Sequence, residues 1–124
     1  MNLLDLEPKY ADYQIRMRRL FHTCPEASTK EFQTAKLIRA ELDKMGIPWR
    51  ECGMPTGTLA TIKGARPGRT ILLRGDIDGL EVTEQTGLEY ASKNEGFMHA
   101  CGHDCHILSL IHILRAHETR HDLV

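Results

Sequence analysis

The sequence has no long apolar run, no basic block and few aromatic side chains. Aromatic residues make up 6% of its 124 residues, and no stretch approaches the about 18 apolar residues that a membrane-spanning helix needs. The N-terminus is acidic and lacks the cationic start of a signal peptide. The 16 basic and 17 acidic side chains nearly cancel, to a net charge of -1, which indicates neither nucleic acid nor an anionic membrane as a partner. We therefore expect a cytoplasmic protein with no nucleic-acid or membrane partner.

Cysteine is also scarce. The four cysteines, Cys24, Cys52, Cys101 and Cys105, are too few for a dense disulfide framework, and a reducing compartment would keep them as thiols. Cys24 and Cys52 are expected to be buried small side chains. The length fits one modest domain.

Two N-terminal segments carry apolar residues at helical spacing. The first predicts a helix from about Glu7 to Phe21. Its expected apolar face consists of Leu6, Tyr10, Tyr13, Met17 and Leu20. Ser28 and Glu31 have the spacing of a capping box, which predicts a second helix that starts at Ser28 and ends at Gly46. Its expected buried stripe consists of Phe32, Ala35, Ile38, Leu42 and Met45.

Strand-like runs follow the helices. Residues 58–63 predict one strand, and the apolar run from Thr70 to Arg74 predicts a second strand that is buried on both faces. Residues 79–98 predict an irregular connection, and from about Cys101 the chain reads as helical again. Two helices, then strands, then a helix predict a layered α/β fold.

Two aspartates follow the second predicted strand. Asp76 and Asp78 stand two positions apart, so in a strand both carboxylates would point to one face. Ligands of open α/β sheets gather at the carboxyl ends of strands, and two close carboxylates repel unless a cation lies near them. The alternative is a solvated turn, in which Asp and Gly are common.

A cluster of soft metal ligands lies in residues 99–106, with the sequence His-Ala-Cys-Gly-His-Asp-Cys-His. Thiolate and imidazole are ligands that zinc and similar ions favour, so Cys101 and His103 are the candidate ligands. Asp104 or His106 would orient them. The alternatives are a redox pair or a chance cluster, but the spacing of Cys101 and Cys105 is not the Cys-x-x-Cys of redox sites.

Two further residues have simpler interpretations. His22 precedes Pro25-Glu26, and although a function is conceivable for it, capping or packing is the commoner role of such a histidine. Trp49 is expected to be a packing residue.

Four segments together resemble the amidohydrolase branch of the aminoacylase and carboxypeptidase superfamily, which includes hippurate hydrolases, auxin-conjugate hydrolases and N-acyl-diaminopimelate deacetylases. The segments are residues 19–26 (R-x-x-H-x-x-P-E), the helix of residues 31–46, residues 73–80 (L-R-x-D-x-D-x-L) and residues 98–106 (M-H-A-C-G-H-D-x-H). The resemblance covers nearly everything up to Ile107. Gly79 and Glu81 depart from it, because the family usually has alanine and proline there.

The resemblance implies a hydrolase that cleaves the amide bond of N-acyl amino acids with a metal-activated water. By it, Cys101 and His103 would be ligands of a site for two divalent ions, either zinc, manganese, nickel or cobalt, and Asp76 or Asp78 would be the strand-end carboxylate. The general base and the other ligands would lie downstream of this chain. The fold would be a partial layered catalytic domain with a mixed sheet flanked by helices, incomplete at its C-terminus, and the full-length parent a possible homodimer. We expect the 124-residue chain alone to be inactive.

Residues 108–124 depart abruptly from the family pattern. Our hypothesis divides the chain into residues 1–107, the N-terminal part of the catalytic domain, and residues 108–124, an aberrant tail. The motif Leu-Ser-Leu-Ile-His-Ile at its start matches a translated transposon sequencing adapter. The alternative is a genuine helix.

Two other functions remain. A non-catalytic module would use the Cys/His cluster structurally, with four ligands closed around the ion. A dipeptidase of the same superfamily is the other, although peptidase branches generally have a different ligand at the position of Cys101.

Overall fold

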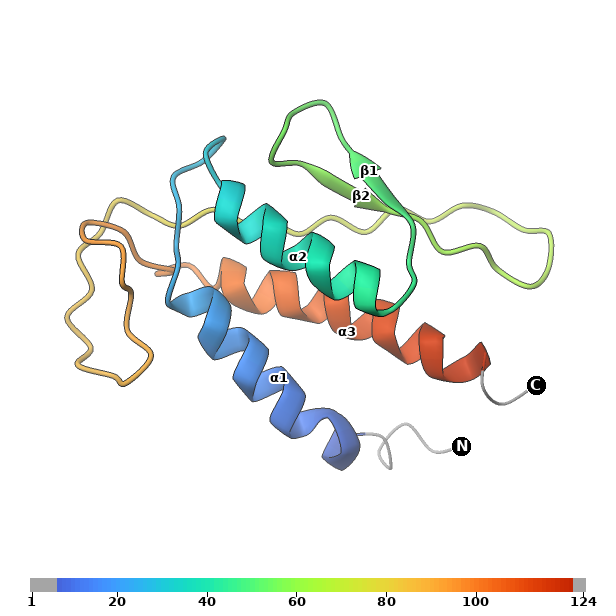
Figure 1. Ribbon diagram of the computed structural model, residues 1–124, viewed down its shortest axis with the longest axis horizontal. Coiled ribbons are helices and arrows are strands. Elements are labelled where there is room, and N and C mark those ends of the chain that lie inside the picture. Colours follow the sequence, from blue (N-terminus) through green and yellow to red (C-terminus); the bar gives the residue numbers. More distant parts are fainter. Residues whose placement is uncertain (1–6, 122–124) are drawn as a thin grey trace.

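The computed structural model describes the backbone of residues 7–121 and the side chains of residues 10–115. Three helices form one layer: α1 (Glu7–His22), α2 (Phe32–Lys44) and α3 (His103–His121). α3 contacts both other helices and lies between them (Figure 1). A short antiparallel pair, β1 (Trp49–Glu51) and β2 (Thr58–Ala60), packs beside α2. No helix in the described part of the chain is long and apolar enough to cross a membrane.

The core lies where α1 and α3 meet. Its buried members are Tyr13, Met17, Phe21, Ile107 and Ile111. Phe21 is completely buried, whereas Leu20, which we expected on the apolar face, is 40% exposed. The prediction for Leu20 was therefore wrong: the helix continues to His22, and Phe21 occupies the core position. Leu6 lies outside the described residues.

The start of α2 differs from the prediction. The helix begins at Phe32, the Ser28 side chain does not cap it, and the carboxylate of Glu31 accepts a hydrogen bond from the Thr29 amide at 2.9 Å. Glu26 caps the helix instead. Its carboxylate accepts hydrogen bonds from the Gln33 amide at 3.0 Å, the Thr34 amide at 2.7 Å and the Thr34 hydroxyl at 2.8 Å. These bonds satisfy amides that have no partner within the helix.

The end of α2 and most of its buried stripe are as predicted. Gly46 has a φ of 64°, and the Ile47 amide donates to the carbonyl of Leu42 at 3.0 Å, the arrangement of a Schellman cap. Ala35 and Leu42 are buried. Phe32 is 60% exposed, so its place in the stripe was wrong. It stands at the first position of a helix that starts later than expected.

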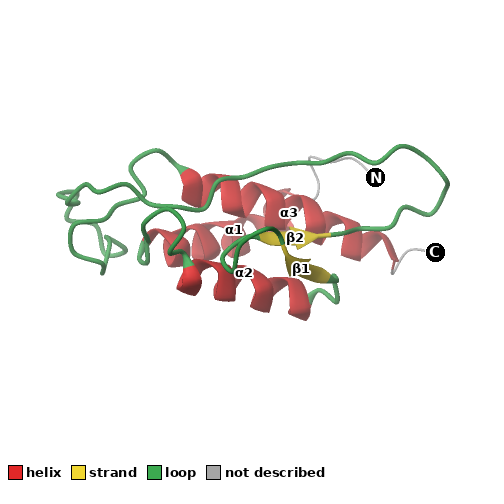
Figure 2. Ribbon diagram, turned by 90° about the horizontal axis from the view of Figure 1, so that it is seen from above, coloured by secondary structure: helices red, strands yellow, loops and turns green. Residues whose placement is uncertain are grey.

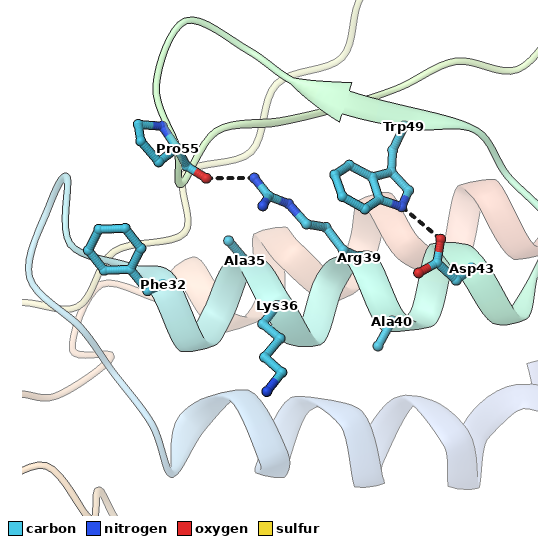
Figure 3. A pocket seen from close by; sticks show the side chains of 8 residues that line it. All are labelled: Phe32, Ala35, Lys36, Arg39, Ala40, Asp43, Trp49 and Pro55. Carbon is cyan, nitrogen blue, oxygen red and sulfur yellow. Dashed lines mark hydrogen bonds between the residues drawn. The ribbon is translucent and has the colours of Figure 1, made fainter.

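The β1–β2 pair is held against α2 by Arg39 (Figure 3). The guanidinium donates to the Pro55 carbonyl at 2.6 Å and lies over the Trp49 ring at 4.7 Å from its centroid. Trp49 donates from its indole to Asp43 at 2.8 Å, so it packs as expected. β2 covers the first half of the strand predicted over residues 58–63.

The second predicted strand is absent. The described residues 61–79 include no strand, and Ile71, Leu72 and Leu73 are 83%, 76% and 55% exposed. The segment is extended and runs along the layer of helices (Figure 2). The prediction of a strand buried on both faces was wrong for this chain, because no neighbouring strand within the described residues pairs with the segment. Residues 79–98 form the expected irregular connection, with one isolated bridge between Leu80 and Met98.

Candidate metal centre

The C-terminal end of α1, the first turn of α3 and the connection of residues 79–98 meet at one end of the molecule (Figure 1). Three hydrogen bonds join the connection to the residues that follow α1. The Gly79 amide donates to the Glu26 carbonyl at 2.7 Å, Asn94 donates from its side chain to the Pro25 carbonyl at 2.7 Å, and the Lys93 amide donates to the Thr23 carbonyl at 2.9 Å. The residues predicted for the site lie at this junction.

His103 and Asp78 are brought together. The Nδ1 of His103 lies 2.9 Å from Oδ1 of Asp78 and 3.0 Å from the Asp78 carbonyl oxygen. Two acceptors at Nδ1 favour the tautomer with its proton on that nitrogen, which leaves the lone pair of Nε2 free to bind a metal. A carboxylate behind a histidine is the usual arrangement around metal ligands.

Asp76 does not join this pair. Its carboxylate accepts hydrogen bonds from Arg74, at 3.1 Å from Nε and 2.9 Å from Nη2, and is 45% exposed. The expectation that both carboxylates would act together is therefore not met: the segment is not pinned in a sheet, and Arg74 binds Asp76.

Cys101 is exposed and has a free thiol, one residue before Gly102. Gly102 has a φ of 98°, a left-handed conformation that residues with a side chain rarely adopt. It links Cys101 to the first residue of α3. Among the described residues no three His, Cys, Asp or Glu side chains gather in a way that could hold an ion. Cys101 and His103 therefore offer part of a coordination sphere.

The two other candidates differ in environment. Asp104 is fully buried, and its Oδ2 lies 2.9 Å from Nε of Arg18. His106 is exposed, and its ring centroid lies 5.3 Å from that of His103. Burial would lower the pKa of Arg18, but Asp104 and its neighbours raise it above its ordinary value.

Sequence reasoning gave no role in the site to three buried groups at this junction. His22, which we interpreted as a packing histidine, is 3% exposed and bridges Asp104 and Glu84. Burial would raise the pKa of Glu84, yet hydrogen bonds from Thr86, Ser92 and His22 lower it overall. Only the R-x-x-H-x-x-P-E pattern around His22 pointed toward this network, and nothing in the sequence marked Glu84.

His99 is the third of these groups. It is 4% exposed, and neither ring nitrogen has a hydrogen-bond partner. Burial lowers its pKa, and Asp104 only partly offsets that effect. Burial therefore favours the neutral form of this imidazole, which stands two residues before Cys101.

A pocket of about 390 Å³ lies elsewhere, on the outer side of α2 (Figure 3). Its lining includes Phe32, Lys36, Arg39 and Trp49 but none of the candidate metal ligands. The site at the end of α1 and α3 is thus separate from it.

This chain is similar in sequence to known hydrolases. A family model described as Peptidase family M20/M25/M40 matches residues 72–123. Thermostable carboxypeptidase 1 of Saccharolobus solfataricus is 46% identical over 81% of this chain and 26% of its own length. N-acetyl-L-cysteine deacetylase of Bacillus subtilis is 45% identical over 90% of this chain and 26% of its own length.

A solved structure has the same fold. The YXEP protein of Bacillus subtilis, described as a dinuclear metal binding peptidase from the M20 family, superposes with a TM-score of 0.86 and 41% identity over 92% of this chain and 32% of its own. This chain spans about a quarter of the length of the curated relatives that it matches. Residues 72–123 of this chain thus match the M20/M25/M40 family of peptidases, and the relatives of the chain include a deacetylase.

Proposed function

We propose that this chain carries part of the active site of a metal-dependent amidohydrolase that cleaves the amide bond of N-acyl amino acids. The observation that carries the proposal is the Asp78–His103 pair, with the exposed thiol of Cys101 two residues before His103 in the chain. The deacetylase among the relatives supports this substrate class, and the carboxypeptidase supports peptides as a second class to be assayed.

The donor set fits a divalent ion. Cys101 and His103 would hold it, because a thiolate and a neutral imidazole are suitable ligands for zinc, manganese, nickel or cobalt. When bound, the metal would supply an activated water for attack on the amide carbonyl. Asp78 keeps the His103 ring oriented through Nδ1. Asp104, the next residue in the chain, and His106, whose ring lies beside that of His103, would support His103.

Asp76 has a weaker claim. Its carboxylate is bound by Arg74, so a role in the site requires that ion pair to open. We propose Asp78 as the carboxylate of the site and Asp76 as its alternative.

The remaining expectations are proposals of the same kind. Residues outside this chain would supply the general base, the further ligands that hold a second ion, and the strands that complete a layered domain. A homodimeric parent and a cytoplasmic location remain predictions. The division at Ile107 also stays a prediction; α3 runs unbroken from His103 to His121, and reading the encoding DNA beyond codon 107 would test the adapter hypothesis.

A structural metal module is the other candidate function. Such sites normally enclose the ion with four protein ligands. The described part of the chain offers no group of three, and its core of α1 and α3 is packed without one. These features favour a catalytic over a structural role.

A chimera tests the proposal. The segment of the Bacillus subtilis N-acetyl-L-cysteine deacetylase that aligns with this chain, 111 residues at 45% identity, is replaced by the residues of this chain. We expect metal-dependent hydrolysis of N-acetyl amino acids, measured together with a dipeptide. Cys101→Ser should abolish it, whereas Cys105→Ser, a change at an exposed thiol four residues later, should not.

Three results would contradict the proposal. One is a folded chimera without activity, and another is equal loss in the Cys101→Ser and Cys105→Ser variants. The third is metal-dependent amide cleavage by the isolated 124-residue chain, which would show that the missing base and ligands are not needed. Unfolding of the isolated Cys101→Ser chain would instead support a structural metal module.

A further inference from the structure

His22 connects three separate parts of the chain at the candidate metal centre. Its Nδ1 lies 2.7 Å from Oδ2 of Asp104, at the start of α3, and its Nε2 lies 3.2 Å from Oε1 of Glu84, in the connection of residues 79–98. The His22 and Asp104 side chains are 3% and 0% exposed. Hydrogen bonds between such deeply buried groups keep a fixed geometry, because each lost partner leaves an unsatisfied polar atom.

Asp104 stands directly after His103, so its orientation fixes the first turn of α3. Its Oδ1 accepts a hydrogen bond from the Cys105 amide at 2.9 Å, and its Oδ2 faces both His22 and Arg18. The residue before His103 is Gly102, which has a left-handed backbone and whose carbonyl accepts hydrogen bonds from the amides of Cys105 and His106 at 3.0 and 3.2 Å. The Asp104 carboxylate is therefore the anchor of this turn.

Glu84 fixes the other end of the His22 bridge. Its Oε2 accepts a hydrogen bond from the Ser92 amide at 2.6 Å, which closes the loop between residues 84 and 92. The Tyr90 ring from this loop meets the His22 ring edge-on, with centroids 5.7 Å apart. The bond from His22 to Glu84 thus orders the loop, whereas the bond to Asp104 orders the helix that carries His103.

We infer that His22 is a positioning residue of the proposed metal centre: through Asp104 it holds the first turn of α3, so that His103 keeps its bond to Asp78 and its Nε2 would be available to an ion. Both ring nitrogens of His22 face carboxylates, so His22 would not itself be a metal ligand. The inference rests on the proposed function for the identity of the ligands. The position of the His103 ring can be measured without any metal.

Two substitutions separate the two bonds of His22. The side-chain amide of asparagine lies near the place of Nδ1 and that of glutamine near the place of Nε2. His22→Asn therefore keeps the bond to Asp104 and loses the bond to Glu84, and His22→Gln does the reverse. Both variants remove one hydrogen bond from the same buried site, so a general loss of stability affects them alike.

The first measurement is cobalt binding by the 124-residue chain, followed through the absorption of the thiolate–Co(II) bond. We expect His22→Gln to weaken binding roughly 10- to 100-fold, the usual effect of losing a residue that supports a ligand, and His22→Asn to change it by less than about threefold. The control is His112→Gln, which removes another α1–α3 contact, to Gln14 at 2.9 Å, about two and a half helical turns away from His103.

The second measurement uses metal-free protein. A long-range ¹H–¹⁵N spectrum reads the protonated nitrogen of each imidazole ring. We expect His103 to carry its proton on Nδ1 in the unaltered chain, in His22→Asn and in His112→Gln, and to show mixed protonation in His22→Gln.

The outcomes separate the positioning role of His22 from the assignment of Cys101 and His103 as ligands. If His22→Gln leaves the His103 spectrum unchanged, or if His22→Asn and His22→Gln alter it equally, His22 does not position His103 and the inference fails. If the spectra differ as expected but no variant binds cobalt, the inference stands and the assignment of Cys101 and His103 as ligands in this chain fails.

Discussion

Glu26 is expected to be the main electrostatic support of α2, and Glu26→Ala should destabilise the chain by about 2–3 kcal/mol. The carboxylate accepts three hydrogen bonds at the start of the helix, at 3.0, 2.7 and 2.8 Å. Loss of a capping side chain costs about 0.5–2 kcal/mol, and a negative charge near a helix N-terminus adds about 0.3–1 kcal/mol. The sum lies near the upper end of these ranges because one side chain meets two amides and a hydroxyl.

The isosteric variant Glu26→Gln separates the contribution of the charge from that of the hydrogen bonds. Glu26→Gln keeps one acceptor oxygen but loses the charge, so it should cost about 1 kcal/mol. Glu95→Ala, at an exposed glutamate in the connection of residues 79–98, should change stability by less than about 0.5 kcal/mol. Urea unfolding followed by circular dichroism gives all three values.

A double-mutant cycle tests the geometry itself. Thr34→Val removes the hydroxyl that donates to Glu26 while keeping the volume of a side chain that is completely buried. The effects of Glu26→Ala and Thr34→Val should be non-additive, because each removes the same bond. Strict additivity, or a cost below about 0.5 kcal/mol for Glu26→Ala, would refute the reasoning.

Two further predictions concern the core and the surface. Burial, followed by the hydrogen bond to Glu41, raises the pKa of Tyr13 to about 12. Because the folded value exceeds the unfolded one, Tyr13 adds stability that is complete below pH of about 10 and is lost as the pH rises through about 12. An ultraviolet titration should therefore show one late tyrosinate step that Tyr13→Phe removes, and a single step near the ordinary value for all tyrosines would contradict this. On the surface, Ile71 and Leu73 are 83% and 55% exposed on an extended segment, and such exposed apolar side chains promote association. The double variant Ile71→Lys and Leu73→Lys should therefore sediment as a smaller species than the unaltered chain. Ile15→Lys, at a residue 51% exposed on α1, is the control, and equal sedimentation of all three proteins would contradict this prediction.

Local sequence signals predicted the helices well. The apolar spacing located α1 to within one residue at its C-terminal end, and Gly46 marked the end of α2 because a left-handed backbone favours glycine. The start of α2 was misplaced because Ser28 and Glu31 have the spacing of a capping box, whereas the cap comes from Glu26, outside that local pattern.

Long-range contacts were harder to predict. The apolar run of residues 70–74 has the composition of a buried strand, but burial requires neighbouring strands, and composition does not reveal whether they are present. Asp78 and His103 are 25 positions apart, and only the family resemblance suggested that they meet. His22 and Asp104 are 82 positions apart, and a lone histidine near the end of a helix gives no sign of such a partner.

The position of α1 has a consequence for how shortened forms of this protein would behave. Every candidate ligand lies at or after residue 76, so a version beginning after residue 30 would retain all of them. It would nevertheless lack Arg18 and His22, the two side chains of α1 that bind the Asp104 carboxylate. Such a version would keep the ligand motif intact in its sequence, and still bind ions poorly.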